Sequence, residues 1–404
     1  MREEIEREAR AAHAAVGALS DEPVAEALGV AARLVGEHRE AIAAANAADL
    51  GAAQGRLDDG ALDRLRLDPP RIAALGAQLE ELSALPALER VEDSWTLTNG
   101  LGVSTQRIPI GAVGANFEAR PNVAVDIAGQ LLKSLNGAVL RTGGAALGTV
   151  TVLVDEVLRP ALAAAGLPPE VVGLVRSPDR EGARILVSLP HLLPLVILRG
   201  SGATTAELAR EAAQHGVRTL AHAEGGGVLY IGPAADPGMA EALVEASLDR
   251  LGVCNRLNVL LVDRASEGQL PRLRAVLDRL GIAVREPERL GYEWANDSEQ
   301  IASVTLRVVA SLEEAVALAN DETSGLAASI VTDDAAIADR FLATYRGTAA
   351  FWNATTRFTD GFALTGSPET GINVDRVPGP RGPVTYRDLW LRQFRVTGDG
   401  TQHR

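Results

Sequence analysis

The sequence contains one cysteine and one lysine among its 404 residues. A lone cysteine, Cys254, excludes a disulfide framework and is typical of a reducing compartment. Lys133 is the only lysine, so arginine supplies the other basic side chains and any one arginine carries little functional signal. A single cysteine is most often a buried apolar filler, and that interpretation of Cys254 stands until its neighbours are considered.

Long apolar runs are also missing. No segment reaches the ~18 consecutive apolar residues that cross a bilayer, and the charged start, MREEIEREAR, lacks the apolar centre of a signal peptide. The formal net charge of −14 disfavours binding to the phosphate backbone of nucleic acids. We therefore predict a soluble, cytoplasmic protein that binds neither membranes nor nucleic acid.

The length of the chain predicts two or three folding units, because a domain averages roughly 150 residues. A hydrophobic content of 47% is enough for a sizeable core. The pattern along the chain predicts an α/β protein. Residues 23–54 and 68–86 place apolar side chains at helical spacing, and the second segment begins with Asp-Pro, a helix start. Alternating segments on both sides of Asn99-Gly100 predict a β-hairpin at about 93–108.

After the hairpin, short apolar strands alternate with helices, which predicts parallel, doubly wound sheets. We divide them between residues 1–228, which include the hairpin, and residues 229–354, which hold Cys254. Residues 355–404 form a return segment that ends in an alternating stretch, 389–398, which needs a sheet to join. The hairpin is the candidate, and the resulting small β arm predicts a homodimer or homotetramer.

Common nucleotide and nucleophile motifs are absent from the sequence. No G-x-G-x-x-G follows the first predicted strand, and there is no P-loop, no G-x-S-x-G elbow and no zinc-like Cys/His spacing. Cys254 follows Gly252 and precedes Asn255, between a predicted helix and strand. Glycine allows close approach of a ligand, adjacent N–H groups stabilise an oxyanion, and a helix dipole or cation populates the thiolate. This segment indicates a nucleophile and leaves the reaction open.

Six segments carry a resemblance that extends, in order, over nearly the whole chain: AANAADL, LDRLRLDPPRIAAL, RIPIGAVGANFEARPNVAVDIAG, LGVCN, NATTRFTDGF and RGPVTYRDL. Together they resemble the glutamate-5-semialdehyde dehydrogenases, also called γ-glutamyl phosphate reductases, of the aldehyde dehydrogenase superfamily. FEARPN and GVCN with RFTDGF are specific in combination, because generic aldehyde dehydrogenases do not share that set. The resemblance implies an aldehyde-dehydrogenase-like fold with two doubly wound domains. Residues 1–228 would form a Rossmann-like, cofactor-binding domain that includes the hairpin, and residues 229–354 a catalytic domain that holds Cys254.

The resemblance also implies a reaction. L-Glutamyl 5-phosphate, the product of an upstream glutamate 5-kinase, would be reduced by NADPH to L-glutamate 5-semialdehyde in proline biosynthesis, with release of phosphate. Cys254 would attack the acyl carbon, phosphate would leave, and hydride would reduce the thioester. A base that activates water would be harmful, because hydrolysis would waste the thioester.

Catalytic and substrate residues follow from the matched motifs. Asn255, with the backbone N–H groups at Cys254, is the candidate oxyanion stabiliser, and a loop-capping asparagine is the alternative. Arg120 suits a carboxylate or phosphate through a bidentate pair, and a buried structural pair with Glu118 is the alternative. For Lys133 the alternative is a solvated helix lysine. The predicted substrate residues are Glu118, Arg120, Asn122, Lys133, Arg357 and Thr359, the last two having a structural turn as their alternative.

NADP is the cofactor that the resemblance implies, and no metal is predicted. Arg141 ends a strand where NAD-dependent relatives carry a lysine followed by an acidic residue, and that acidic position is Gly144 here, which leaves room for a 2′-phosphate. A glycine–serine turn at a predicted helix start suits a pyrophosphate, and His222 shapes the nicotinamide pocket or has a structural role. The predicted cofactor residues are Arg141, Thr142, Gly143, Gly144, Arg199, Gly200, Ser201, His222, Glu224 and Gly225.

Three stretches depart from the family pattern: residues 225–228, 323–329 and 373–380. In the second of them Leu326 replaces a histidine. The departures spare GVCN, so they bear on the acyl group more than on the type of reaction. The first alternative is therefore a paralogue that reduces a different amino-acid-derived acyl phosphate or semialdehyde in specialised metabolism. The second is a non-catalytic partner of the upstream kinase, which an intact Cys254 disfavours.

Overall fold

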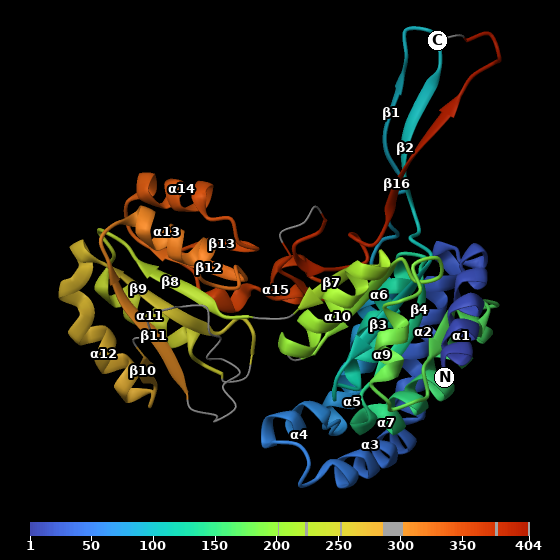
Figure 1. The fold of residues 1–404 in the computed structure, drawn as a ribbon, viewed down its shortest axis with the longest axis horizontal. Coiled ribbons are helices and arrows are strands. Elements are labelled where there is room, and N and C mark those ends of the chain that lie inside the picture. Colours follow the sequence, from blue (N-terminus) through green and yellow to red (C-terminus); the bar gives the residue numbers. More distant parts are fainter. Residues whose placement is uncertain (201, 223–224, 251–252, 286–301, 376–378, 403–404) are drawn as a thin grey trace. The chain divides into compact units, whose positions relative to one another are not determined.

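The computed structural model describes residues 1–200, 202–222, 225–250, 253–285, 302–375 and 379–402. The chain forms two compact units, which are coloured along the chain in Figure 1. Unit 1 comprises Met1–Ala221, Ser367–Gly371 and Val384–Arg404, and unit 2 comprises His222–Gly366 and Ile372–Pro383. The first boundary thus falls between Ala221 and His222, whereas we expected it at residue 228. The return segment 355–404 is divided between the two units.

Unit 1 begins with helices, as the apolar spacing predicts. They are α1 (Arg2–Ala15), α2 (Asp21–Glu37), α3 (Arg39–Ala53), α4 (Asp59–Leu65) and α5 (Pro69–Ala84). The apolar spacing of residues 23–54 continues past His38, where the backbone leaves the helical region between α2 and α3, so spacing alone does not locate this break. α5 begins where Asp-Pro predicts, because the Asp68 carboxylate accepts a hydrogen bond from N of Arg71 at 2.9 Å.

A five-stranded sheet forms the centre of unit 1, in the order β5-β4-β3-β6-β7. Its strands are β3 (Ala112–Phe117), β4 (Gly137–Thr142), β5 (Val172–Leu174), β6 (Leu195–Arg199) and β7 (Arg218–His222). β3 pairs in parallel with β4 on one side and with β6 on the other. The predicted doubly wound sheet is confirmed, and its strand order reverses between β3 and β6, the place where such sheets bind ligands at the carboxyl ends of strands.

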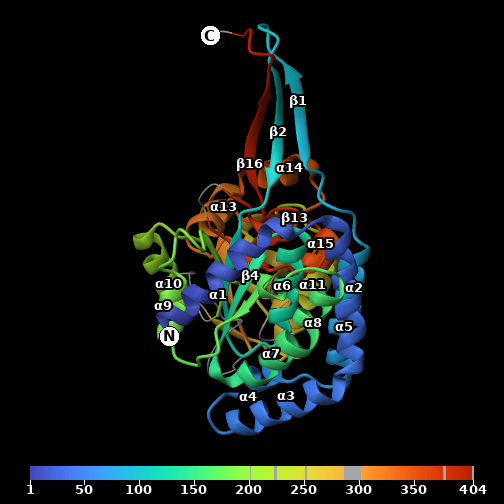
Figure 2. The same cartoon turned by 90° about the vertical axis from the view of Figure 1, so that its right-hand side faces the viewer.

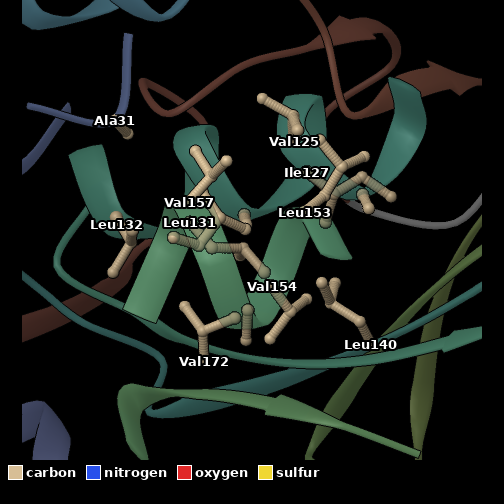
Figure 3. Packing of buried hydrophobic residues seen from close by; sticks show 14 of the residues in the cluster. Ala31, Val125, Ile127, Leu131, Leu132, Leu140, Leu153, Val154, Val157 and Val172 are labelled. Carbon is tan, nitrogen blue, oxygen red and sulfur yellow. The ribbon is translucent and has the colours of Figure 1, made fainter. Parts of the chain in front are cut away.

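The connections of unit 1 contain α6 (Asn122–Lys133), α7 (Leu147–Val152), a π-helical segment (Leu153–Leu158), α8 (Arg159–Ala164), α9 (Glu181–Leu186) and α10 (Gly202–His215). α7, the π-helical segment and α8 follow one another without a break, so the middle of this run is π-helical. Figure 3 shows this run packed against α6 and the strands, through buried side chains that include Val125, Ile127, Leu131, Leu140, Leu153, Val154, Val157 and Val172. This packing fixes α6, which carries two of the predicted site residues, Asn122 and Lys133.

Unit 2 contains a six-stranded sheet in the order β10-β11-β9-β8-β12-β13, and all the pairs within it are parallel. Its strands are β8 (Gly227–Ile231), β9 (Leu257–Asp263), β10 (Ala283–Arg285), β11 (Ser303–Val309), β12 (Ala327–Val331) and β13 (Ala349–Trp352). Its helices are α11 (Pro237–Ser247), α12 (Leu270–Arg279), α13 (Leu312–Asp321), α14 (Ala335–Thr344) and α15 (Gly361–Thr365). The second predicted doubly wound sheet is therefore confirmed.

Two small sheets complete the architecture. β14 (Gly371–Asn373) pairs with β15 (Gly382–Val384), and β1 (Val91–Thr96), β2 (Gly102–Ile108) and β16 (Leu391–Thr397) form a three-stranded sheet in the order β1-β2-β16. The expected pairing of the last strand with the hairpin is confirmed. Figure 2 shows these three strands extending away from the helices of unit 1. None of the helices in the described part of the chain has the length and apolar character needed to span a bilayer.

Candidate active site

Cys254 lies in unit 2, in the turn that leads into β9. It is partly exposed and packs against a small apolar cluster formed by Leu326, Ala327 and Ile372. Because β9, β8 and β12 are neighbours in a parallel sheet, the segments that lead into these strands gather at one edge of it. Cys254 is therefore not the fully buried filler that a lone cysteine most often is.

Three glycines at the start of β8 bring the chain against the Cys254 turn. N of Gly226 donates a hydrogen bond to O of Cys254, and N of Gly227 donates to O of Arg256, each at 2.6 Å. A Cβ at Gly225 would lie 2.5 Å from O of Cys254, and Gly226 has a φ of 101°, which strains other residues. The glycine run that departs from the family pattern thus fits the backbone of the cysteine turn, and Gly225, which we predicted at the cofactor, contacts Cys254.

Asn255 is buried, and its side chain is tied to the segment 355–359. Its Nδ2 donates to O of Arg357 at 2.9 Å and to O of Thr359 at 3.1 Å, and its Oδ1 accepts from the Arg357 guanidinium. Nε of Arg357 also donates to Oδ1 of Asp249 at 2.7 Å. Both N–H groups of the Asn255 amide are used within the protein, so the candidate oxyanion donors are the backbone N–H groups at Cys254 and Asn255.

Arg256 is a buried residue of this turn that the sequence analysis does not single out. It is 1% exposed, and its Nη1 donates to O of Leu257 at 3.4 Å and to O of Ser303 at 3.1 Å. Burial lowers the pKa of its guanidinium, and the charge of Asp249 opposes that effect. Arg256 therefore joins β9 to the start of β11, and no pattern in an arginine-rich sequence distinguishes it.

In unit 1 the turn after β3 carries Glu118 and Arg120 at the carboxyl edge of the sheet. N of Glu118 donates to O of Arg199 at 3.2 Å, and a Cβ at Gly200 would lie 3.0 Å from Cδ of Glu118. Ala119 has a φ of 31°, a strained conformation of the kind that gathers at functional turns. The structure thus brings Glu118, Arg199 and Gly200 together where the strand order reverses.

Arg141 ends β4 and is buried. Its guanidinium donates to Oδ1 of Asn116 at 3.0 Å, to O of Pro178 at 3.1 Å and to O of Asp179 at 2.9 Å. Burial lowers its pKa, which the charge of Glu118 opposes. In this arrangement Arg141 fastens the loop after β5 to the sheet, a geometry that favours a structural role over contact with a cofactor.

The residues after Arg141 combine an unsatisfied hydroxyl with an uncrowded glycine. Oγ1 of Thr142 is buried and has no hydrogen-bond partner among the residues that the structure describes. A Cβ at Gly143 would lie 3.9 Å from its nearest neighbour, N of Ala119, whereas at Gly144 it would lie 3.0 Å from Cβ of Pro178. An open glycine beside an unsatisfied hydroxyl at the carboxyl edge fits the close approach of a dinucleotide.

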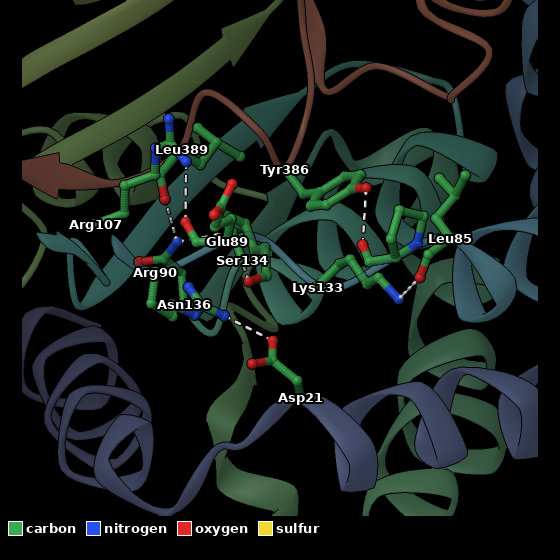
Figure 4. Close-up of polar contacts among 12 residues, drawn as sticks. Asp21, Leu85, Glu89, Arg90, Arg107, Lys133, Ser134, Asn136, Tyr386 and Leu389 are labelled. Carbon is green, nitrogen blue, oxygen red and sulfur yellow. Dashed lines mark hydrogen bonds and ion pairs between the residues drawn. The ribbon is translucent and has the colours of Figure 1, made fainter. Parts of the chain in front are cut away.

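Lys133 lies at the end of α6 and is buried. Its Nζ donates to O of Ser83 at 3.2 Å and to O of Leu85 at 2.6 Å, as Figure 4 shows for Leu85. Burial lowers the pKa of the amino group, and the charge of Asp21 opposes this. Lys133 thus satisfies carbonyl groups at the end of α5 and beyond it, a geometry that favours a structural role over contact with the substrate.

The remaining predicted residues are placed as follows. Asn122 donates from Nδ2 to Oδ2 of Asp126 at 3.0 Å, and the sequence analysis does not single out Asp126. Thr359 is buried, and its Oγ1 has no hydrogen-bond partner within the described part of the chain. His222 ends β7. Ser201 and Glu224 lie outside the described residues.

The chain is similar to proteins of known family over most of its length. The Aldehyde dehydrogenase family matches residues 2–280. A gamma-glutamyl phosphate reductase of Rhodospirillum rubrum is 36% identical over 374 residues, 89% of this chain and 86% of that protein. One of Clavibacter michiganensis is 38% identical over 389 residues, 92% of this chain and 88% of that protein. The crystal structure of gamma-glutamyl phosphate reductase from Thermotoga maritima covers 99% of this chain and 100% of its own, with a TM-score of 0.91 and 28% identity.

Proposed function

The chain belongs to the aldehyde dehydrogenase family and, within it, to the γ-glutamyl phosphate reductases, and from this membership we propose that it reduces L-glutamyl 5-phosphate to L-glutamate 5-semialdehyde, with release of phosphate, in proline biosynthesis. It is an oxidoreductase that uses a nicotinamide cofactor. The observation that carries the proposal is the position of Cys254. This residue is the only cysteine and is partly exposed. It lies on a turn that is hydrogen-bonded to the backbone of Gly226 and Gly227 and to residues 355–359. We place the reaction in the cytoplasm, where a thiol stays reduced.

The proposed chemistry uses Cys254 as a covalent nucleophile. Its thiolate attacks the acyl carbon of the substrate, and the backbone N–H groups at Cys254 and Asn255 stabilise the oxyanion. The C–O bond to phosphate then breaks, phosphate takes the electron pair, and a thioester remains on the enzyme. A bound nicotinamide supplies hydride to the thioester carbon. Cleavage of the C–S bond then returns the thiolate to Cys254 and releases the aldehyde.

NADP is the proposed form of the cofactor. Thr142, Gly143 and Gly200 would hold it at the carboxyl edge of β4 and β6, with the start of α10 beside the pyrophosphate. Gly144 supports NADP over NAD, because no carboxylate at that position would repel a 2′-phosphate. We keep His222 and Glu224 as proposed residues of the nicotinamide pocket.

The reverse reaction tests the proposal without an unstable acyl phosphate. Purified protein is mixed with NADP, L-glutamate 5-semialdehyde and inorganic phosphate, and NADPH is followed by absorbance at several phosphate concentrations. The proposal predicts NADPH formation that requires phosphate and is faster with NADP than with NAD. Cofactor binding without turnover of this aldehyde would contradict the proposed substrate.

A second candidate substrate class is favoured by Leu326. This side chain is fully buried and packs in the same apolar cluster as Cys254, at the position where the family carries a histidine. An apolar residue there supports a paralogue that reduces a different amino-acid-derived acyl phosphate. Turnover of another amino-acid semialdehyde, in preference to the glutamate compound, would establish this alternative in the same assay.

We also propose a homodimer or homotetramer joined through the β1-β2-β16 arm. Apolar side chains of these strands are exposed, with Phe394 59% and Trp95 40% exposed. The two rings are arranged edge to face, with their centroids 6.4 Å apart. An exposed apolar sheet of this kind marks an interaction surface. Light scattering of Phe394→Glu, with Arg395→Glu as the control on the same strand, should show a smaller species for the first variant alone. Adding glutamate 5-kinase to the wild type tests for association of the two enzymes.

A further inference from the structure

We infer that Asp126 and Arg199 bind the amino-acid head group of the substrate, with Oδ1 of Asp126 accepting a hydrogen bond from the α-ammonium group and the Arg199 guanidinium facing the α-carboxylate. The inference rests on the proposed function, which supplies a substrate that carries both charges. It gives Asp126 a role that no motif indicated, and it moves Arg199 from the cofactor to the substrate.

Within the described residues, the Asp126 carboxylate has one oxygen with a hydrogen-bond partner and one without. Asp126 lies in the first half of α6, and its Oδ2 accepts a hydrogen bond from Nδ2 of Asn122 at 3.0 Å, which fixes the orientation of the group. Oδ1 is buried, and no residue in the described ranges donates a hydrogen bond to it. A buried carboxylate oxygen without a donor destabilises a protein, and such groups in native structures mark functional sites.

Two charged side chains act on the Asp126 carboxylate in opposite directions. Arg199, at the carboxyl end of β6, favours the charged carboxylate, whereas Glu369 of the return segment disfavours it. Arg199 also lies along the return segment, since a Cβ at Gly371 would be 3.6 Å from its Cδ. A cationic ligand donor would favour the charged carboxylate further, and an α-ammonium group is such a donor.

Gln130 is the residue of α6 that holds the return segment through side-chain hydrogen bonds. Gln130, one turn further along α6, accepts from N of Tyr386 at 2.6 Å and donates from Nε2 to Oγ of Ser367 at 3.3 Å. These contacts tie α6 to both parts of the return segment within unit 1. The polar groups of Gln130 are therefore satisfied within the protein, in contrast to Oδ1 of Asp126.

Stability provides a readout that does not depend on activity. Burial raises the pKa of Asp126 from 3.8 to about 7, with Glu369 acting in the same direction and with Arg199 and Asn122 opposing it. The folded state therefore binds an extra proton between these values, and the stability of the ligand-free protein falls as the pH rises from about 4 to about 7. Asp126→Asn removes this loss, so we expect a higher melting temperature than wild type at pH 8.5 and a smaller difference at pH 5.

The kinetic test compares two aldehydes in the reverse reaction at saturating NADP and phosphate. L-Glutamate 5-semialdehyde, with its concentration expressed as the open-chain form, carries the α-ammonium group, and 5-oxopentanoate is the same molecule without it. We expect Asp126→Asn to lower kcat/KM for the amino substrate on the order of 10²-fold, mainly through KM, and to change that for 5-oxopentanoate by less than about 3-fold. Arg199→Met should weaken both substrates, because both carry the carboxylate.

Asp388→Asn is the matched control. Asp388 is another carboxylate of unit 1 whose pKa burial raises, but its Oδ2 accepts from N and Oγ1 of Thr385 at 2.8 and 3.2 Å. Its substitution should lower stability and leave the ratio of the two aldehydes unchanged. Equal losses for both aldehydes in Asp126→Asn, or a lower melting temperature at pH 8.5, would overturn the inference. If wild type uses neither aldehyde, the proposed function fails instead.

Discussion

Gly225 is the residue on which the position of Cys254 depends most directly. A Cβ there would lie 2.5 Å from O, 2.6 Å from Cβ and 2.7 Å from Cα of Cys254, all closer than van der Waals contact allows. We expect Gly225→Ala to displace the thiol and lower kcat on the order of 10²-fold, the cost of a misplacement of about 1 Å, with the cofactor Kd unchanged. Steady-state kinetics and cofactor titration measure the two effects.

Gly36→Ala is the control for this substitution. Gly36 lies in α2, and an added Cβ would meet no described atom within 4 Å. Alanine gives the unfolded chain less conformational freedom than glycine does, so this variant should be slightly more stable than wild type. Its activity should equal that of wild type. Full activity of Gly225→Ala would show that the turn adapts and that the close approach is not needed.

Lys133 provides a second test at the scale of one residue. Lys133→Met removes the donor to O of Ser83 and O of Leu85, which leaves two carbonyl groups without it. We expect the free energy of unfolding to fall by about 1–3 kcal/mol, as measured by urea denaturation. The KM for the aldehyde should stay within about 2-fold of wild type. A large rise in KM at unchanged stability would restore the substrate role that the sequence predicts.

The segment 355–359 acts as an element that clamps the cysteine turn. Arg357 links Asp249 and Asn255, and the Asn255 amide bonds back to O of Arg357 and O of Thr359. Because the two side chains belong to one network, the effects of Asn255→Ala and Arg357→Ala on kcat should not add. We expect each single variant to lose about 10-fold or more in kcat, and the double variant to lose little beyond the larger single loss.

A double-mutant cycle on a surface pair is the control for this network. Arg346 and Asp321 form an exposed ion pair in unit 2 at 3.1 Å, and its removal should change stability by less than about 1 kcal/mol and leave kcat unchanged. Additive losses for Asn255 and Arg357 would mean that each acts alone, as a direct contact with the reacting groups would.

The elements of the fold were largely predictable from local pattern, and the roles of the buried charges were not. Apolar runs separated by helices predict both doubly wound sheets, and Asn-Gly predicts the hairpin that β16 joins. Arg141, by contrast, bonds to O of Asp179, and Lys133 to O of Ser83, partners that are far away in the sequence. Local pattern holds no information on such pairs, so these contacts could not be predicted from the sequence.

The site itself was predictable only in part, for the same reason. Cys254 is identified by its uniqueness and by its glycine and asparagine neighbours. The run of glycines at 225–227 reads as a departure from the family until the structure shows it against Cys254. Asp126 has no sequence signal, because an aspartate within an apolar helix looks like any solvated position until its free oxygen is seen to be buried.

At the scale of the whole molecule, the chain divides its proposed tasks between two discontinuous units. Cys254 belongs to unit 2, whereas Thr142, Gly143 and Gly200 belong to unit 1. A substitution that abolishes the chemistry in unit 2 should therefore leave cofactor binding in unit 1 unchanged. Cys254→Ala changes a small side chain in unit 2, and it should leave the cofactor site of unit 1 intact.

The reverse reaction of Cys254→Ala, with its NADPH affinity measured on the same preparation, is the most direct test of the covalent mechanism. We predict that phosphate-dependent formation of NADPH from L-glutamate 5-semialdehyde and NADP falls below detection, while the Kd for NADPH stays within about 3-fold of wild type. Substantial residual turnover in this variant would contradict the covalent mechanism, because no other thiol in the chain could replace Cys254.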